Sequence, residues 1–115
     1  MEQLQTTVTF PKIAPGDLAE FKRLAAQALE LAKGEAAVLQ YDWCFSGDET
    51  KCVVRETYEN SDAVLAHMAN LGELTEKLAA LGGGLELEFF GTLSPQLAEA
   101  AAALQPTAYG FFQGK

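Results

Sequence analysis

The sequence has little of what most functional sites are built from. Its 115 residues include one histidine, one tryptophan and two cysteines. There is no second histidine to accompany His67, and Cys44 and Cys52 do not have Cys-x-x-Cys spacing. These absences argue against the common zinc and histidine-rich metal sites. A Gly-x-Ser-x-Gly motif is missing, and the glycine run at 82–84 lacks the Lys-Ser/Thr of a phosphate loop. We therefore expect no zinc or histidine-rich metal site and no phosphate loop at the glycine run.

Positive charge is also scarce. The chain carries 8 Lys and Arg against 16 Asp and Glu, a formal net charge of −8 at pH 7. The basic residues are scattered along the chain, whereas phosphate binding requires them to be clustered. The sequence therefore predicts no nucleic-acid partner and no anionic membrane surface. Its acidity is that of an ordinary soluble surface.

Long apolar runs are missing as well. No stretch approaches the roughly 20 apolar residues of a membrane span. The first residues, Met1 to Gln5, have neither the positive charge nor the apolar block of a secretion signal. We therefore expect a cytoplasmic protein that does not contact a membrane. In that reducing compartment, Cys44 and Cys52 are expected to be free thiols.

Residues 1–115 are expected to form one domain, because a chain of this length can bury a hydrophobic core of its own. Alternation over Thr6–Phe10 predicts a first strand. An apolar face at helical spacing predicts a helix from Asp17 to Lys33, ended by Gly34.

A hairpin follows this helix. Ala37–Phe45 and Thr50–Tyr58 are predicted strands, joined by a four-residue turn at 46–49. This register sets Trp43 opposite Cys52, and it places the two cysteine side chains on opposite faces of the sheet. Both strands are interpreted as mostly apolar on both faces, which predicts a sheet that is covered on both sides.

The second half of the chain repeats the alternation of helix and strand. Ser61 is the expected cap of a helix that runs from Asp62 to Ala69, breaks at 70–72 and resumes over Glu73–Leu81. Three further elements are expected: a half-exposed strand over Leu85–Leu93, a short helix over Gln96–Leu104 that follows Ser94-Pro95, and a last short strand within Ala108–Gln113.

This β-α-β-β-α-β order predicts an α+β, ferredoxin-like fold with one antiparallel sheet. Helices cover one face of such a sheet and leave the other face open. We interpret that second face as too apolar for water, which predicts a homodimer whose two sheets face each other.

Three segments carry a resemblance to a known family: 41–46 (YDWCFS), 55–61 (RETYENS) and 63–67 (AVLAH). With the order of elements between Thr7 and Phe112, they resemble the dimeric α/β-barrel family of antibiotic-biosynthesis-type monooxygenases. The alanine-rich third helix and the Tyr-Gly-Phe-Phe ending are similar to uncharacterised members.

The resemblance implies a homodimer and a small-molecule pocket within each subunit, between the sheet and the helices. It implies a cofactor-independent monooxygenase that acts on a small aromatic or quinol-like compound with dioxygen. Two alternatives stay open. One is a non-enzymatic ligand-binding or stress-associated barrel, and the other is haem binding through His67, since the family includes haem-degrading relatives.

His67 is the candidate catalytic residue. In an oxygenase without a cofactor, a base removes a phenolic or acidic C–H proton, and the resulting anion gives an electron to dioxygen. Histidine titrates near neutral pH and can accept that proton. The alternative is a buried histidine bonded to a strand group such as Glu56.

The candidate substrate-binding residues are Trp43, Tyr41, Tyr58, Glu56 and Asn70. The aromatic side chains would shape the pocket and stack a planar substrate, whereas Glu56 and Asn70 would orient groups within it. The alternatives are core or dimer packing for the aromatic residues, a structural ion pair for Glu56, and helix termination for Asn70. Arg55, set opposite Gln40 and diagonal to Asp42, is interpreted as part of a cross-strand polar pair.

Overall fold

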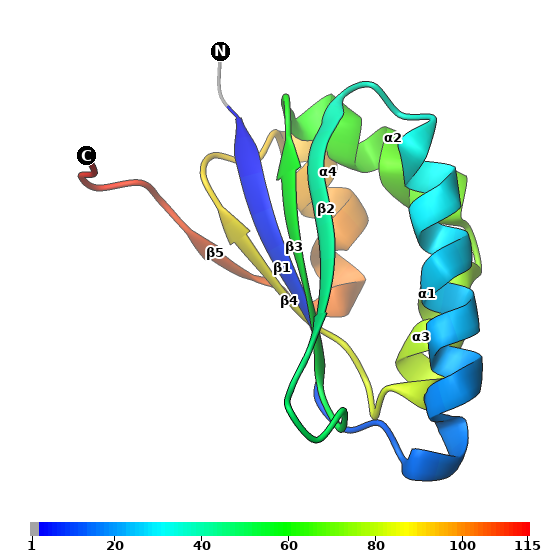
Figure 1. Cartoon of the computed structure of the whole chain (residues 1–115). Coiled ribbons are helices and arrows are strands. Elements are labelled where there is room, and N and C mark those ends of the chain that lie inside the picture. The colour runs from blue at the N-terminus through cyan, green and yellow to red at the C-terminus, as the bar shows by residue number, and fades with distance from the viewer. Residues whose placement is uncertain (1–2) are drawn as a thin grey trace.

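The computed structural model describes residues 3–115 as a five-stranded sheet with helices packed on one face (Figure 1). In chain order the elements are β1 (Leu4–Phe10), a 3₁₀ turn (Pro15–Asp17), α1 (Leu18–Lys33), β2 (Val38–Phe45), β3 (Cys52–Tyr58), α2 (Ser61–Leu71), α3 (Leu74–Leu81), β4 (Glu86–Phe90), α4 (Pro95–Ala101), a 3₁₀ turn (Ala102–Leu104) and β5 (Thr107–Tyr109).

The strands are ordered β2-β3-β1-β4-β5, and the first four pair antiparallel. This is the expected ferredoxin-like α+β fold. A last strand is present, but it lies at Thr107–Tyr109 and shares only Ala108 and Tyr109 with the predicted segment, and it pairs parallel with β4. The sheet is therefore mixed, not purely antiparallel, because the α4 crossover returns the chain in the direction of β4.

The predicted hairpin register is wrong by two residues. Phe45 pairs with Cys52 and Trp43 pairs with Val54, so the loop covers 46–51. The reason lies in the loop, where the Asp48 carboxylate accepts hydrogen bonds from the side chains of Ser46 and Thr50 and from the Thr50 amide. These bonds stabilise a longer connection, and they lower the pKa of Asp48 below its usual value.

A shift of two residues leaves every side chain on its expected face, because side chains alternate with a period of two. Cys44 is exposed on the open face of the sheet and Cys52 is buried on the covered face, and both are free thiols. Burial raises the pKa of the Cys52 thiol to about 11. Arg55 lies opposite Asp42, not opposite Gln40, with 3.7 Å between its Nη2 and the Asp42 carboxylate.

The open face is polar, which corrects the expectation that it is too apolar for water. Gln40 accepts a hydrogen bond from Thr57 on this face, and Glu88 accepts one from Thr7. The earlier expectation treated both hairpin strands as apolar on both faces. The observed pairing instead assembles rows of polar side chains there, namely Gln5, Thr7, Thr9, Gln40, Asp42, Arg55, Thr57, Glu86 and Glu88.

The helix ends follow the local sequence with one correction. Asn60, not Ser61, caps α2, because its side chain accepts a hydrogen bond from the Ala63 amide. The Ser61 hydroxyl accepts a hydrogen bond from the Ser94 amide and so ties α2 to the start of α4. Gly72, with φ of 55°, separates α2 from α3 in a conformation that glycine adopts without strain.

The core occupies the covered face in two clusters. One lies between α1, α3 and the strands, where the Phe21 ring packs edge-on against Phe10 with 5.1 Å between ring centroids. The other lies beneath α2 and α4 around Tyr58 and Phe89. The site described below lies between these two clusters.

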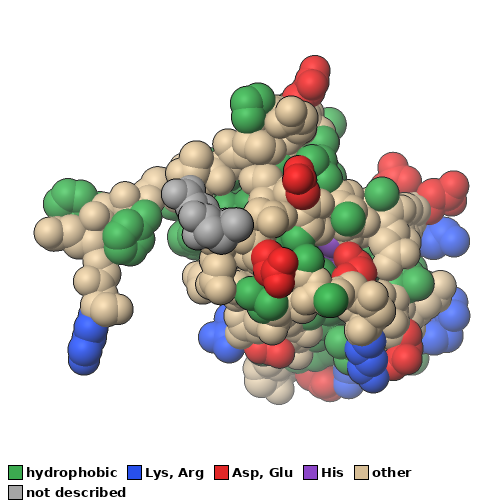
Figure 2. Space-filling model, turned by 90° about the horizontal axis from the view of Figure 1, so that it is seen from above, with side chains coloured by type: hydrophobic (Ala, Val, Ile, Leu, Met, Phe, Trp, Pro, Cys, Tyr) green, Lys and Arg blue, Asp and Glu red, His purple; other side chains and the backbone are tan. Residues whose placement is uncertain are grey.

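The chain beyond β5 leaves the body of the molecule. Figure 1 shows this C-terminal arm, residues 110–115, running away from the sheet, and Figure 2 shows hydrophobic side chains along it. Phe111 and Phe112 are 80% and 87% exposed. The two exposed phenylalanines therefore form a continuous apolar stretch on the arm.

Candidate functional site

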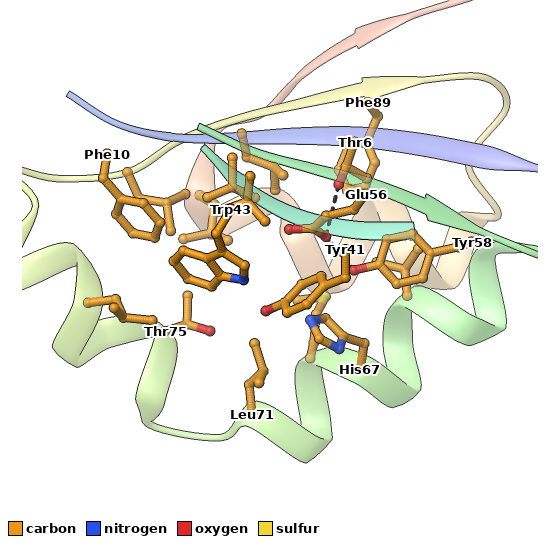
Figure 3. A pocket seen from close by; sticks show the side chains of 18 residues that line it. Thr6, Phe10, Tyr41, Trp43, Glu56, Tyr58, His67, Leu71, Thr75 and Phe89 are labelled. Carbon is orange, nitrogen blue, oxygen red and sulfur yellow. Dashed lines mark hydrogen bonds between the residues drawn. The ribbon is translucent and has the colours of Figure 1, made fainter. Parts of the chain in front are cut away.

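A cavity of about 80 Å³ lies between the covered face of the sheet and helices α2 and α3 (Figure 3). All but one of the predicted site residues line it. Its wall is mainly apolar and consists of Thr6, Val8, Phe10, Tyr41, Trp43, Val54, Glu56, Tyr58, Val64, His67, Met68, Leu71, Thr75, Leu78, Leu85, Leu87, Phe89 and Leu104.

His67 reaches the cavity from the inner side of α2 and is almost fully buried. Its Nδ1 lies 3.0 Å from Oε2 of Glu35. Glu35 follows Gly34, directly after the end of α1, so the two groups come from positions far apart in the chain. The histidine therefore bonds to Glu35, and not to Glu56 as the alternative interpretation supposed.

The contact with Glu35 fixes the role of each ring nitrogen. A carboxylate accepts hydrogen bonds, so Nδ1 carries the hydrogen that it donates to Glu35. Nε2 is buried and has no hydrogen-bond partner among the described residues. In the neutral ring, this nitrogen is the one with the free lone pair, and it belongs to a side chain that lines the cavity.

The aromatic side chains form a connected stack along the cavity. The Trp43 ring lies parallel to Phe10 at 6.0 Å and edge-on to Tyr41 at 5.8 Å between centroids. Tyr41 in turn meets the His67 ring at 4.9 Å. The indole Nε1 of Trp43 is a second buried nitrogen without a partner among the described residues.

Glu56 lies in the wall contributed by β3, and hydroxyl groups surround it. Its Oε1 accepts a hydrogen bond from Thr6 at 3.0 Å and another from the Tyr58 hydroxyl. Burial raises the pKa of Glu56, although the hydrogen bonds from Tyr58 and Thr6 and the positive charge of His67 act in the opposite direction.

The two tyrosines are hydrogen-bond donors at neutral pH. Burial, followed by the nearby Glu56, raises the pKa of both Tyr41 and Tyr58 well above the usual range. Neither hydroxyl can therefore act as a base, and His67 is the basic group of the cavity wall.

Asn70 is the predicted site residue that does not line the cavity. It is exposed near the end of α2, and its amide donates hydrogen bonds to Oε2 of Glu35 and to the Leu31 carbonyl. Asn70 therefore helps to position the Glu35 carboxylate, which is itself bonded to His67. Glu35 and Thr6 were missed by the sequence analysis, because a glutamate after a helix and a threonine in a strand carry no local signal of their contacts.

Metal and haem sites are not supported. Residues 3–115 contain no group of three or more His, Cys, Asp or Glu side chains that would hold a metal ion. Haem does not fit the cavity, since about 80 Å³ is far less than a porphyrin ring needs. Among the described residues no helix is both long and apolar enough to traverse a bilayer.

Comparison with solved structures supports the fold. MupZ from Pseudomonas fluorescens superposes with a TM-score of 0.80 and 23% identity, covering 98% of this chain and 92% of that one. A putative antibiotic biosynthesis monooxygenase from Caulobacter crescentus gives 0.64 and 21%, covering 80% and 91%. Another from Nitrosomonas europaea gives 0.63 and 18%, covering 81% and 92%. A search of curated proteins found no match.

The family model "Antibiotic biosynthesis monooxygenase" matches residues 5–80, which is well over half of the chain. The match spans β1 to α3 and so includes the strands and the helix that supply Trp43, Glu56 and His67. The chain therefore belongs to the antibiotic biosynthesis monooxygenase family.

Proposed function

We propose that this protein binds a small aromatic or quinol-like molecule in the cavity and oxidises it with dioxygen, without a metal or organic cofactor. The observation that carries the proposal is the arrangement of His67. Glu35 holds its Nδ1, and its Nε2 is buried without a partner in the wall of an otherwise apolar cavity.

The chemistry follows from that geometry. Nε2 takes a proton from a phenolic O–H or an acidic C–H of the bound molecule, and the Glu35 carboxylate stabilises the imidazolium that forms. The substrate anion then gives an electron to dioxygen. The apolar wall favours this step because dioxygen is itself apolar and because excluding water protects the anion from reprotonation.

The size of the cavity restricts the substrate. A cavity of about 80 Å³ is smaller than the roughly 150 Å³ cavity that holds benzene in another protein. A single-ring molecule therefore requires side chains to move. Leu104 both lines the cavity and is 41% exposed, so it lies at the mouth. Met68 is the most adaptable side chain of the wall.

The charge of the wall restricts the substrate further. Among the described residues no Lys or Arg lines the cavity, whereas Glu56 does. A carboxylate or phosphate group would lose its hydration there without gaining a cation. We therefore propose an uncharged substrate.

Oxygen consumption with hydroquinone tests the proposal. We expect turnover by the wild-type protein and a loss of roughly 100-fold or more in His67→Gln, since the amide cannot act as a base. Lys77→Gln, on the outer surface of α3, is the control and should keep full activity. An equal rate in His67→Gln and wild type would contradict the assignment of the base.

Binding without turnover is the competing function. The packing of Trp43, parallel to Phe10 and edge-on to Tyr41, favours it, because these rings line the cavity whether or not a reaction follows. Trp43 is the only tryptophan, so its fluorescence reports occupancy of the cavity directly. Quenching by hydroquinone with no oxygen uptake would support a binding protein and exclude the oxygenase.

We also propose that two copies pair across the open face of the sheet and that each C-terminal arm reaches the other copy. This face has no helix over it, and the arm carries the exposed Phe111 and Phe112 away from its own body (Figure 1). A groove between the arm and the sheet, lined in part by Phe90 and Tyr109, would receive the partner. The two free thiols fit a cytoplasmic location.

Light scattering during gel filtration tests the pairing. We expect a dimer at micromolar concentration and a shift towards monomer when Phe111 and Phe112 are both changed to serine. A wild-type monomer at that concentration would contradict the proposed assembly.

A further inference from the structure

Glu56 is a second titratable group of the cavity, and the base mechanism does not use it. Its two carboxyl oxygens have different surroundings. Oε1 accepts both nearby hydroxyl donors, Thr6 from β1 and Tyr58 from the same strand. Oε2 makes no hydrogen bond among the described residues, and Figure 3 shows the second carboxyl oxygen turned into the cavity, away from Thr6.

The groups that face Glu56 are mostly uncharged. They are Thr6 on β1, Tyr41 on β2, Tyr58 on β3 and His67 on α2. His67 is the one basic group of the described cavity wall, and its Nδ1 is already paired with Glu35 at 3.0 Å. An ionised Glu56 would therefore be a buried carboxylate without a dedicated cation, which is costly.

We propose that Glu56 is a neutral carboxylic acid at neutral pH and that its Oε2–H is the proton donor of the cavity, in the same site as the base His67. The proton is on Oε2 because Oε1 already accepts two hydrogen bonds. The proposed chemical role rests on the proposed oxygenase function, whereas the protonated state stands on the geometry alone.

The two groups together complete the oxidation of a ring carbon of a quinol to a carbonyl. His67 Nε2 takes a phenolic O–H proton, and the neighbouring ring carbon of the anion forms a C–O bond to dioxygen, which is reduced to a bound peroxide. The Glu56 Oε2–H bond breaks, and its proton makes the hydroperoxide. The Glu56 carboxylate then takes the proton of that ring carbon as the O–O bond breaks and the carbonyl forms.

The hydroxide that leaves takes the imidazolium proton and becomes water. Both side chains return to their starting states, and for hydroquinone the sum is C₆H₆O₂ + O₂ → C₆H₄O₃ + H₂O. Such paired proton transfers need a protonated acid and an unprotonated base in one cavity, and Glu56 and His67 would supply them.

The ligand class follows from this pair. The molecule that fits offers an oxygen acceptor to Glu56 and an acidic hydrogen to His67, and it carries no negative charge. A quinol of one ring meets these conditions, whereas benzoate does not, because it offers His67 no acidic hydrogen and its charge would meet no Lys or Arg in the described wall.

Infrared spectroscopy of the unliganded protein tests the protonated state without any substrate. We expect the C=O stretch of a protonated carboxylic acid at neutral pH, shifted in D₂O and lost in Glu56→Gln. Glu88→Gln is the matched control, because Glu88 also accepts hydroxyls of a threonine and a tyrosine, but on the open face of the sheet. It should leave the band unchanged.

Tyr58→Phe gives a second readout if Glu56→Gln folds poorly. Tyr58 favours the ionised form of Glu56, so its removal should keep the band and move its titration to higher pH. No carboxylic acid band in the wild-type protein at neutral pH, or a band that Glu56→Gln leaves in place, would overturn the inference.

The catalytic part has a separate outcome. In single turnovers, Glu56→Gln should bind hydroquinone as tightly as wild type, by Trp43 fluorescence, but react roughly 100-fold more slowly. An unchanged rate would overturn the role as acid. Absence of turnover in the wild-type protein would remove the oxygenase function, and the infrared band would still decide whether Glu56 is protonated.

Discussion

Two glutamates on opposite faces of the same sheet have nearly the same hydrogen-bond partners. Glu56 on the covered face accepts the hydroxyls of Thr6 and Tyr58. Glu88 on the open face accepts those of a neighbouring threonine and a tyrosine of β5. The kinds of donor are therefore alike, but both donors bond the same oxygen of Glu56, whereas each oxygen of Glu88 receives one.

The difference between them is burial. Glu56 is 7% exposed, and burial raises its pKa against the effect of its hydrogen bonds. Glu88 lies on the open face, opposite Thr7, and is less buried than Glu56. Similar donors therefore meet a buried carboxyl group on one face and a partly exposed one on the other.

The tyrosines give the largest expected effect. Tyr58 is 1% exposed and Tyr109 is 45% exposed. Tyr58→Ala should lower the free energy of unfolding by about 3–5 kcal/mol, because it leaves a cavity in the core. Tyr109→Ala should lower it by less than about 1 kcal/mol. Urea unfolding of the two variants measures both, and equal losses would remove the distinction between the faces.

Glu35 provides the next largest effect. Glu35→Gln replaces the carboxylate that holds the buried His67, and it should cost roughly 1–3 kcal/mol in the free energy of unfolding. Asn70→Ala is the companion variant, since it removes a donor to the same carboxylate, and it should cost about 1 kcal/mol. Thermal unfolding that is unaffected by either change would contradict the Glu35 contact.

The pH dependence of stability separates the two glutamates directly. The pKa of Glu56 is raised from 4.5 in the folded state, so unfolded chains lose this proton first as the pH rises above about 4.5. Wild type should therefore lose stability relative to Glu56→Gln from pH 4.5 upward, by at most about 1.4 kcal/mol per pH unit. This loss of stability ends where the pH exceeds the pKa of Glu56 in the folded protein.

Glu88→Gln is the control for this measurement. Its difference from wild type should change little over the same pH range. If the difference between Glu56→Gln and wild type were equally flat, the raised pKa of Glu56 would be wrong.

The smallest effect is expected at the ion pair of the open face. Arg55 and Asp42 lie 3.7 Å apart, and both side chains are more than half exposed. Such pairs contribute about 0.2–1 kcal/mol. A double-mutant cycle with Arg55→Ala and Asp42→Ala should give a coupling free energy in that range that disappears at high salt. A larger and salt-independent coupling would indicate that this face is buried against a partner.

Much of the fold could be predicted because it depends on local patterns. The Asp17–Lys33 helix, the break at Gly72 and the alternation of β4 are visible in the sequence and are found in the structure, with α1 beginning at Leu18. Tyr41, Trp43 and Glu56 were placed on one face even with a wrong register, since an error of two residues preserves the side of the sheet.

The parts that were not predicted depend on contacts between distant side chains. Glu35 lies 32 positions before His67, and only the packing of α1 beside α2 brings them together. The length of the hairpin loop depends on the hydrogen bonds that the Asp48 carboxylate accepts from Ser46 and Thr50. The alternation of apolar and polar residues in the strands does not predict these bonds. The polarity of the open face was not predicted, because it depends on which side chains of neighbouring strands lie next to one another.

The most direct test of the account is the tautomer of its single histidine. Because His67 is the only histidine, a ¹⁵N correlation spectrum of labelled protein contains one imidazole pair. Above neutral pH we expect a protonated Nδ1 and a bare Nε2, and we expect Glu35→Gln to disturb this pattern. A ring protonated at Nε2, with Nδ1 bare, would contradict both the Glu35 contact and the base that faces the cavity.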